Sequence, residues 1–464
     1  MTMNQMLIQL AYLFAAFVFI VALRALGRPD TARRGMQLAA LGMLVAVAAT
    51  LLHARVISYE WIAAGAVIGA LAGYPLGMWV PIAAMPQRIA LSHAFGALAA
   101  TLVGVGEYAN GFSAGELSHG HVAALGLEVL LGGLTVTGSL MAFGKLQELL
   151  PGRPITFRFQ NGINFALLAS ALTCLIWSIV FPTDTYSFGA MLVVSVLVGV
   201  TLVLPIGGAD MPVVVSLLNS YAGLAAVATG FAVDNNILIV VGALDGASGF
   251  ILSVAMSKAM NRSFTNVLFG AFGSDNGDSV SVSQGVQGEM SAISAEDAAA
   301  RLAYAERTIV VPGYGLAVAQ AQHQARDLAN LLEKRGAEVR FAIHPVAGRM
   351  PGHMNVLLAE AGVPYDKLVD MEEINERFSE TDVVVVVGAN DVVNPAARTN
   401  KSSPIYGMPI LKVADAKKVI VLKRGTGKGF SGVENELFFY PKTSMLFGDA
   451  RQSLLHLALE VKNA

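Results

Sequence analysis

Apolar and charged positions divide this chain into two unlike parts. Residues 1 to about 260 hold only 20 of its 64 Asp, Glu, Lys and Arg residues, and the rest of the chain holds the other 44. A helix needs about 20 consecutive apolar residues to span the hydrocarbon core of a bilayer. The first part has nine such stretches, at about 6–26, 36–54, 61–80, 89–107, 121–144, 162–181, 188–206, 212–232 and 236–258. We therefore expect a polytopic α-helical membrane bundle, since helices satisfy their backbone hydrogen bonds without water.

Basic residues between these stretches predict the orientation of the bundle, because cytoplasmic loops are enriched in Lys and Arg. Alternate loops hold Arg24, Arg28, Arg33, Arg34, Arg88, Lys145, Arg153, Arg158, Lys258 and Arg262. The opposite set of loops holds only Arg55. The N-terminus is expected outside and the C-terminal part in the cytoplasm. No basic segment precedes the first stretch, so we interpret it as a retained helix and not as a signal peptide.

The second part alternates between strand and helix patterns. Strands are expected at 309–311, 338–343, 383–387 and 419–422, with a helix over 316–335 and another opening at Ser294. This alternation is typical of a doubly wound, Rossmann-like α/β domain with a parallel sheet. Residues 271–292 are rich in Gly, Ser, Asp and Gln and predict a linker. The predicted organisation is a transmembrane domain over 1–262, a linker over 263–292 and the α/β domain over 293–464.

Composition excludes several classes of function. The net charge of −2 gives no reason to expect a nucleic-acid partner. There is no Gly-Lys-Ser/Thr phosphate loop for ATP-driven transport, and no cluster of metal ligands is apparent. His119 and His121 have a metal-like spacing without further ligands, and a solvated loop is the simpler interpretation. The single cysteine, Cys174, lies in an apolar run, where packing explains it.

Polar groups within the apolar stretches are candidates for function. They are His93, Glu128, Asn219 and Asp245. An ionisable group at membrane depth costs about 2.5 kcal/mol or more unless it is paired or hydrated. Histidine suits a proton carrier because its ordinary pKa is near neutral. The alternatives are a satisfied core histidine for His93, helix–helix packing for Asn219 and a solvated loop carboxylate for Asp210.

The glycines of this part have a simpler interpretation. Gly65, Gly69, Gly73 and Gly77, like Gly132 and Gly133, predict close helix packing.

A glycine turn in the second part suggests a dinucleotide site. Gly313-Tyr314-Gly315 directly follows a strand, although the third position of the glycine fingerprint is Val318. The second strand ends in Ile343-His344-Pro345, without the acidic residue that would bind an NAD ribose. The pair Lys423-Arg424 follows a later strand, and two cations there suit the 2′-phosphate of NADP. The sequence favours NADP over NAD, with a solvated strand end as the alternative for the basic pair.

Seven longer segments carry a family resemblance. They begin at Ile206, Leu218, Lys258, Val311, Ile343, Gly388 and Leu446, and include IGGADMPVVVS, VPGYGLAVAQ, IHPVAGRMPGHMN and GANDVVNPAA. Together they make the chain resemble, over its whole length, the beta subunit of proton-translocating nicotinamide nucleotide transhydrogenase. The resemblance implies reversible hydride transfer from NADH to NADP⁺, Re/Si-specific and coupled to inward proton movement across the inner (plasma) membrane. It also implies that NADP(H) binds this chain, that NAD(H) binds a partner alpha subunit with further membrane helices, and that alpha–beta units form a dimer.

The resemblance also assigns roles by position. It implies that His93 lies in the proton path, with Asn219 as its polar neighbour and Asp210 linking the path to the nucleotide domain. It implies that the nucleotide is bound by Gly313, Tyr314, Gly315, Arg349, Asn390, Asp391, Lys423 and Arg424, with Asp391 near the nicotinamide. No nucleophile or acid–base residue is expected, because hydride transfer needs alignment and exclusion of water. Gly425 stands where the family commonly has Ser, and Asp245 has no role in the family pattern.

Another class of function fits the same residues. A membrane transporter or channel could use its NADP domain only as a redox sensor, without hydride transfer. A third possible class of function is a membrane-anchored NADP-binding module without proton coupling. Nucleotide turnover and proton coupling distinguish the three.

Overall fold

The computed structural model divides into two compact units, Met1–Val254 and Ala255–Ala464. It describes residues 3–52, 58–81, 84–151, 154–207, 210–260, 289–349, 352–401, 403, 405–427, 429 and 431–464. Arg55, Arg153, Arg262 and most of the predicted linker lie outside these residues. The domain boundaries expected from the sequence therefore stay a prediction.

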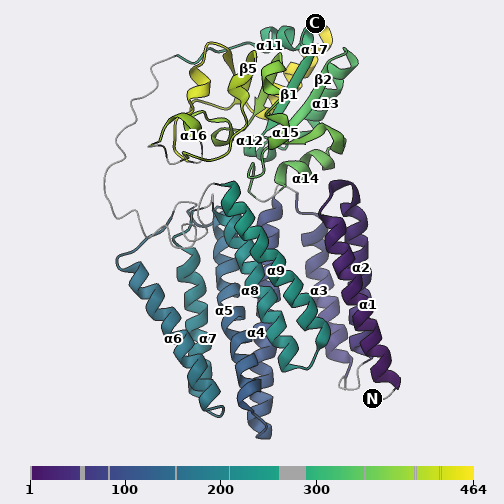
Figure 1. Cartoon of the computed structure of the whole chain (residues 1–464), viewed down its shortest axis with the longest axis vertical. Coiled ribbons are helices and arrows are strands. Elements are labelled where there is room, and N and C mark those ends of the chain that lie inside the picture. The colour runs from purple at the N-terminus through teal and green to yellow at the C-terminus, as the bar shows by residue number, and fades with distance from the viewer. Residues whose placement is uncertain are drawn as a thin grey trace. The chain divides into compact units, whose positions relative to one another are not determined.

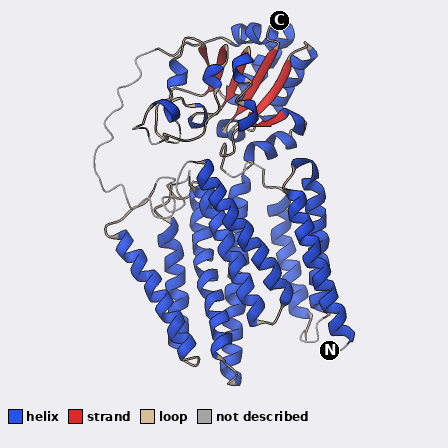
Figure 2. Ribbon diagram, viewed as in Figure 1, coloured by secondary structure: helices blue, strands red, loops and turns tan. Residues whose placement is uncertain are grey.

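The first unit is helical, which confirms the predicted membrane bundle (Figures 1 and 2). Within the described residues, nine helices are long and apolar enough to cross a membrane. They are α1 (Met3–Leu26), α2 (Pro29–Leu51), α3 (Glu60–Met78), α4 (Met85–Ala114), α5 (His119–Leu146), α6 (Gln160–Val180), α7 (Thr185–Val203), α8 (Met211–Ala232) and α9 (Asn236–Ala259). Each predicted stretch falls on one helix, and several helices extend beyond the apolar stretch.

The ends of these helices follow local sequence. Ser118 precedes α5 and accepts a hydrogen bond from the backbone amide of His121, and Asp184 does the same for Tyr186 at the start of α7. Both side chains satisfy amide groups that lack a partner inside the helix. Gly115 ends α4 with φ +70°, a left-handed conformation that favours glycine. The helix limits are therefore set by capping residues as well as by the apolar stretches.

Helix α5 is the centre of the first unit and packs against α4, α6, α7 and α8. Small residues allow this close approach. A side-chain carbon at Gly133 would lie 2.2 Å from Ser195 Oγ, and one at Gly199 would lie 2.2 Å from the Leu134 carbonyl oxygen. The expected packing role holds for Gly132 and Gly133. For the glycines of α3 it stays a prediction, because a side chain at Gly65, Gly69, Gly73 or Gly77 would meet nothing within 4 Å among the described residues of this chain.

The second unit contains a six-stranded, fully parallel sheet in the order β3-β2-β1-β4-β5-β6. The strands are β1 (Arg307–Pro312), β2 (Glu338–Ile343), β3 (Leu368–Asp370), β4 (Val383–Val387), β5 (Lys418–Lys423) and β6 (Thr443–Phe447). This order confirms the predicted Rossmann-like fold. It places the reversal of strand order between β1 and β4, where such folds bind ligands at the carboxyl ends of the strands.

Helices cover the sheet (Figure 2). They are α11 (Ala295–Ala303), α12 (Tyr314–Val318), α13 (Gln322–Lys334), α14 (His353–Glu360), α15 (Met371–Ile374), α16 (Ala396–Thr399) and α17 (Ala450–Asn463). One core joins alternate strand residues, such as Ile309, Val384 and Val419, to Phe378 and Phe438. All five valines of β4 are buried, as expected for a central strand covered on both faces.

Local differences from the predicted elements have physical reasons. The helix expected over 316–335 is two helices, α12 and α13, because Gln320 adopts a left-handed conformation with φ +48°. Strands β3 and β6 were not predicted, since each is short and lies at an edge of the sheet. The helix expected after Ser294 is confirmed, and the Ser294 hydroxyl accepts from the amide of Asp297.

Candidate functional site

The predicted glycine turn meets the end of β4 in direct backbone contact. The amide of Gly313 donates to the Val387 carbonyl at 2.9 Å, and the amide of Gly315 donates to the Gly388 carbonyl at 2.9 Å. A side-chain carbon at Gly313 would lie 2.4 Å from Ala389 Cα, and one at Gly315 would lie 2.7 Å from Gly388 Cα. Only glycine fits both positions. The turn after β1 and the loop after β4 therefore meet at the point where the strand order reverses. Ligands of this fold bind there, in a crevice outside the carboxyl ends of the strands.

Arg349 stacks on the tyrosine of the turn. Its guanidinium carbon lies 4.4 Å from the centroid of the Tyr314 ring, a cation–π arrangement that fixes the position of the charge. The backbone amide of Arg349 donates to His353 Nδ1 at 3.0 Å. His353 has an exposed fraction of 0%, and burial, aided by the charge of Arg349, lowers the pKa of its imidazole to about 4. His353 is therefore neutral at physiological pH, while Arg349 supplies the positive charge.

A buried histidine ends β2 where an NAD-binding domain would carry an acid. His344 has an exposed fraction of 1%, its Nε2 lies 2.8 Å from the Pro409 carbonyl oxygen, and the Val346 amide donates to its Nδ1 at 3.2 Å. Burial lowers the pKa of this imidazole to about 4, so it stays neutral. Nε2 is the donor in this arrangement. The end of β2 therefore offers no carboxylate to a ribose.

The basic pair lies at the carboxyl end of β5, next to β4. Lys423 is half-buried, its ammonium lies 4.7 Å from the centroid of the Phe438 ring, and it donates to the Gly427 carbonyl. Burial lowers the pKa of Lys423, and the nearby carboxylate of Asp391 opposes this effect. Arg424 is exposed and has no ion pair among the described residues. One cation is thus held in place, and the other is available to a ligand.

Asn390 and Asp391 fasten the loop that follows the basic pair. The amide and hydroxyl of Ser431 donate to the two carboxylate oxygens of Asp391 at 2.9 and 2.7 Å. The Asn435 side chain donates to the backbone and side-chain oxygens of Asn390, both at 3.0 Å. Gly429 is close to both residues, since a side-chain carbon there would lie 2.4 Å from Asp391 Oδ1. The loop after β5 is therefore tied to the loop after β4.

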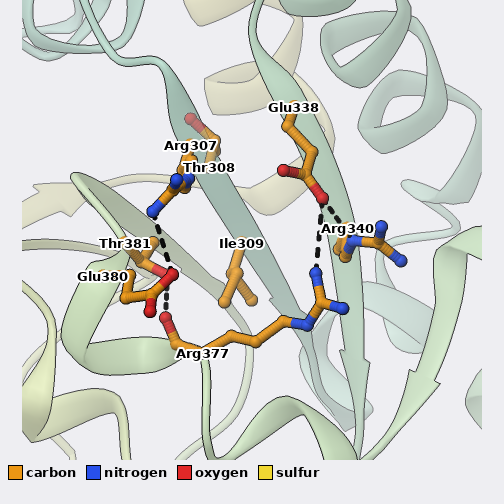
Figure 3. A pocket seen from close by; sticks show the side chains of 8 residues that line it. All are labelled: Arg307, Thr308, Ile309, Glu338, Arg340, Arg377, Glu380 and Thr381. Atoms are coloured by element: carbon orange, nitrogen blue, oxygen red, sulfur yellow. Dashed lines mark hydrogen bonds and ion pairs between the residues drawn. The ribbon is translucent and has the colours of Figure 1, made fainter.

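A separate pocket of about 120 Å³ lies at the amino ends of the strands (Figure 3). Ion pairs line it: Arg307 with Glu380 at 2.9 Å, and Arg340 and Arg377 with Glu338 at 2.7 and 3.5 Å. The hydrogen bond from Arg340, with the neighbouring arginines, lowers the pKa of Glu338. Because ligands of this fold bind at the opposite ends of the strands, this pocket lies away from the candidate site.

In the membrane unit, two hydrogen bonds between polar groups join α8 to α9. Asn219 Nδ2 of α8 donates to Asp245 Oδ1 of α9 at 3.1 Å, and one residue further along each helix the Ser220 hydroxyl donates to the Gly246 carbonyl at 2.8 Å. In the described part of the chain, His93 Nδ1 is buried without a hydrogen-bond partner. The structure thus brings Asn219 and Asp245 together.

Three other polar residues of this unit lie away from that group. Glu128 of α5 is fully buried and accepts from the Thr229 hydroxyl of α8 at 2.7 Å. Lys145 is buried at the end of α5 and donates to the carbonyls of Val203, Leu204 and Ile206, where its charge favours the C-terminus of α7. Asp210 stands directly before α8 with an exposed fraction of 9%, so the alternative of a solvated carboxylate is wrong.

The nucleotide-site residues expected from the sequence gather around the carboxyl ends of β1, β4 and β5. Sequence reasoning missed the groups that hold them, namely Gly388, Gly429, Ser431, Asn435, Phe438 and His353. The polar residues after the basic pair were the available signal. They could not be assigned because their partners lie about 40 positions away along the chain.

Fold and site together define a polytopic membrane protein that carries a Rossmann-like α/β domain with a glycine turn at the carboxyl ends of its central strands. The family model described as NAD(P) transhydrogenase beta subunit matches residues 8–460. This chain belongs to that family. It is 48% identical over 457 residues to the protein named NAD(P) transhydrogenase subunit beta from Rhodospirillum rubrum, covering 97% of this chain and 98% of the relative. A relative of the same name from a defined strain of that species gives the same values.

Membership in the family makes the chain a subunit of an oxidoreductase that uses nicotinamide nucleotides. A beta subunit implies an alpha subunit as partner, and the helical unit makes the protein a multi-pass membrane protein.

Proposed function

We propose that this chain binds NADP(H) and carries the main proton path of the transhydrogenase complex. Hydride would pass reversibly from NADH, held by the alpha subunit, to NADP⁺ held here, while protons move inward. The observation that carries the proposal is the backbone contact between the Gly313–Gly315 turn and the loop after β4, with Lys423 and Arg424 at the end of the neighbouring strand. The neutral, buried His344 at the end of β2 supports NADP over NAD.

The residues of the crevice fit this cofactor. Gly313 and Gly315 give the backbone room to approach a pyrophosphate, and the stacked Arg349 places a cation beside the turn. Lys423 and Arg424 would hold the 2′-phosphate through charge-assisted hydrogen bonds. The bound nicotinamide supplies the hydride chemistry. Asn390 and Asp391 would position the nicotinamide end, since their bonds to Ser431 and Asn435 fix the loop there.

We place the proton path at His93, Asn219 and Asp210. His93 can hold a proton at membrane depth, and its buried, unpartnered Nδ1 leaves one ring nitrogen open to a water molecule or a proton. Protonation there would shift the nucleotide domain between a form that exchanges nucleotide and a form that transfers hydride. By linkage, the redox state of the bound nucleotide would shift the proton affinity of the path by the same factor.

The proposal includes an arrangement in the cell. The chain would span the inner membrane with its N-terminus outside and its nucleotide domain in the cytoplasm. It would work with its alpha subunit in a dimer of alpha–beta units. The ten-to-one distribution of basic residues between the two sets of loops supports the orientation.

The test is hydride transfer from NADH to an NADP⁺ analogue in sealed vesicles holding this chain and its alpha subunit. We expect an imposed inward proton gradient to accelerate the reaction. We also expect His93→Ala to abolish the acceleration while NADPH binding persists, with the exposed His456→Ala as the matched control. Turnover indifferent to the gradient in tight vesicles would refute proton coupling. Solute flux without any nucleotide turnover would instead favour a redox-sensing transporter.

A further inference from the structure

The loop after β5 is rich in glycine. It follows the basic pair and contains Gly425, Gly427, Gly429 and Gly432. A side-chain carbon at Gly425, Gly427 or Gly432 would meet nothing within 4 Å among the described residues. Glycine loses more conformational freedom on ordering than any other residue. A loop of this composition therefore keeps a fixed position only where another element of the domain holds it.

Ser431 attaches this loop to Asp391 through two of its own groups. Its backbone amide donates to Asp391 Oδ2 at 2.9 Å, and its hydroxyl donates to Asp391 Oδ1 at 2.7 Å. Both oxygens accept and neither donates, which is the arrangement of an ionised carboxylate. Hydrogen bonds to an ionised acceptor are shorter and stronger than those between neutral groups. Ser431 therefore gives the loop a charge-assisted attachment to the loop after β4.

A tight turn fixes the direction of the Ser431 hydroxyl. Its Oγ also accepts from the backbone amide of Val433 at 3.2 Å. Gly432, between these two residues, has φ +72°, a left-handed conformation that favours glycine. A hydroxyl has one hydrogen and can accept as well as donate. Because its oxygen accepts from Val433, its hydrogen is free to point at Asp391, and the turn presents the hydroxyl to the carboxylate.

The start of the same loop carries the exposed cation of the basic pair. Lys423 donates to the Gly427 carbonyl and so closes a short turn that contains Arg424. Gly429 then lies against Asp391, since a side-chain carbon there would lie 2.4 Å from Asp391 Oδ1. The described part of the loop is thus held near its start by Lys423 and near its end by Asp391. The position of Arg424 relative to the loop after β4 depends on both attachments.

We propose that Ser431 is a positioning residue that determines nucleotide specificity. Through the bond from its hydroxyl to Asp391 it holds the glycine loop, and with it Arg424, where the 2′-phosphate of NADP(H) binds. Ser431 acts through Asp391 and does not itself contact the nucleotide. Loss of the hydroxyl therefore weakens binding of NADPH, which carries the 2′-phosphate, and not of NADH, which lacks it. The inference rests on the proposed function, because it deepens the NADP(H) site.

The test uses the full chain in detergent without the alpha subunit, so that a second NADH site does not contribute. The dissociation constants of NADPH and NADH are measured by nucleotide fluorescence at fixed ionic strength. We expect Ser431→Ala to weaken NADPH binding by about tenfold, the scale of one hydrogen bond to a charged group, and to leave NADH binding nearly unchanged. Ser431→Thr keeps the hydroxyl and should restore NADPH binding. Ser379→Ala, at an exposed position before β4, is the matched control.

A double-mutant cycle shows whether Ser431 acts through Asp391. In an Asp391→Asn background the hydroxyl has no carboxylate to bind, so Ser431→Ala should add little further loss of NADPH binding. Full additivity of the two substitutions, or a wild-type ratio of the two dissociation constants in Ser431→Ala, would overturn the role of Ser431. A wild type that binds both nucleotides equally would instead refute the assignment of NADP(H) to this chain, and the specificity role with it.

Discussion

The backbone amide of Gly315 donates to the carbonyl oxygen of Gly388 at 2.9 Å, and the two residues approach so closely that neither tolerates a side chain. Gly388 also has φ +65°, a conformation that favours glycine. Two loops separated by more than seventy positions therefore share one backbone contact. This contact joins the glycine turn after β1 to the loop after β4.

Substitution at this contact should damage the crevice. Gly315→Ala places a carbon 2.7 Å from Gly388 Cα, and backbone atoms cannot move aside cheaply. We expect the free energy of unfolding of the α/β unit to fall by about 1–3 kcal/mol and NADPH affinity to fall with it. Equilibrium titration of NADPH fluorescence and thermal unfolding measure both. Gly336→Asn is the control, because Gly336 has a left-handed conformation in open space that Asn tolerates. Wild-type affinity in Gly315→Ala would contradict the placement of the crevice.

The exposed cation of the basic pair should decide between NADPH and NADH. A hydrogen bond to a charged group contributes about 1.5–3 kcal/mol. We therefore expect Arg424→Gln to weaken NADPH binding by about tenfold or more and to leave NADH binding nearly unchanged. The ratio of the two dissociation constants at fixed ionic strength is the measurement. Arg451→Gln, at an exposed position in α17, should change neither constant. An equal loss for both nucleotides would place Arg424 away from the 2′-phosphate.

Acid should loosen the α/β unit near β2 and α14. His344 and His353 have folded-state pKa values of about 4, below the ordinary 6.5, because both are buried. Between pH 6.5 and 4 the unfolded chain binds protons that the folded chain does not. Stability is therefore complete above pH 6.5 and falls as the pH drops toward 4, by up to about 3 kcal/mol for each residue. Hydrogen exchange of β2 and α14 at several pH values checks this, and His353→Gln should show a shallower dependence than the control His456→Gln.

Lys145 should stabilise the junction of α5 with the end of α7. It donates to three backbone carbonyls there, of Val203, Leu204 and Ile206. Lys145→Met leaves these groups without their donor, and each buried group without a partner costs about 1–3 kcal/mol. We expect a clear fall in the midpoint of thermal unfolding in detergent. Lys258→Met, at an exposed position in the last turn of α9, should leave the midpoint nearly unchanged. Equal midpoints for both variants would argue against this role.

Periodic, local features predicted the architecture well. The nine membrane-spanning helices and the alternation of strands and helices could be predicted without the tertiary structure. Segments that are buried in lipid or in the core of a sheet consist of continuous runs of apolar residues, and these runs are visible in the sequence. The break at Gln320 and the short edge strands β3 and β6 were missed, since a single left-handed residue and three to five edge positions leave little pattern. The glycines of α3 have no packing partner among the described residues of this chain, and a stripe of small residues does not by itself show what packs on it.

The sequence by itself determined the membrane bundle, the Rossmann-like domain and the family resemblance, and it predicted residues for a nucleotide site. These features could be predicted because residue type and spacing along the chain depend on local conformation and on burial. Only the tertiary structure decided that Gly313 and Gly315 abut the end of β4, that Asp391 fastens the loop after β5, and that Asp245 is hydrogen-bonded to Asn219. Such pairings join distant segments through backbone approach and hydrogen bonds, which depend on how the elements pack and not on the order of residues within any one of them.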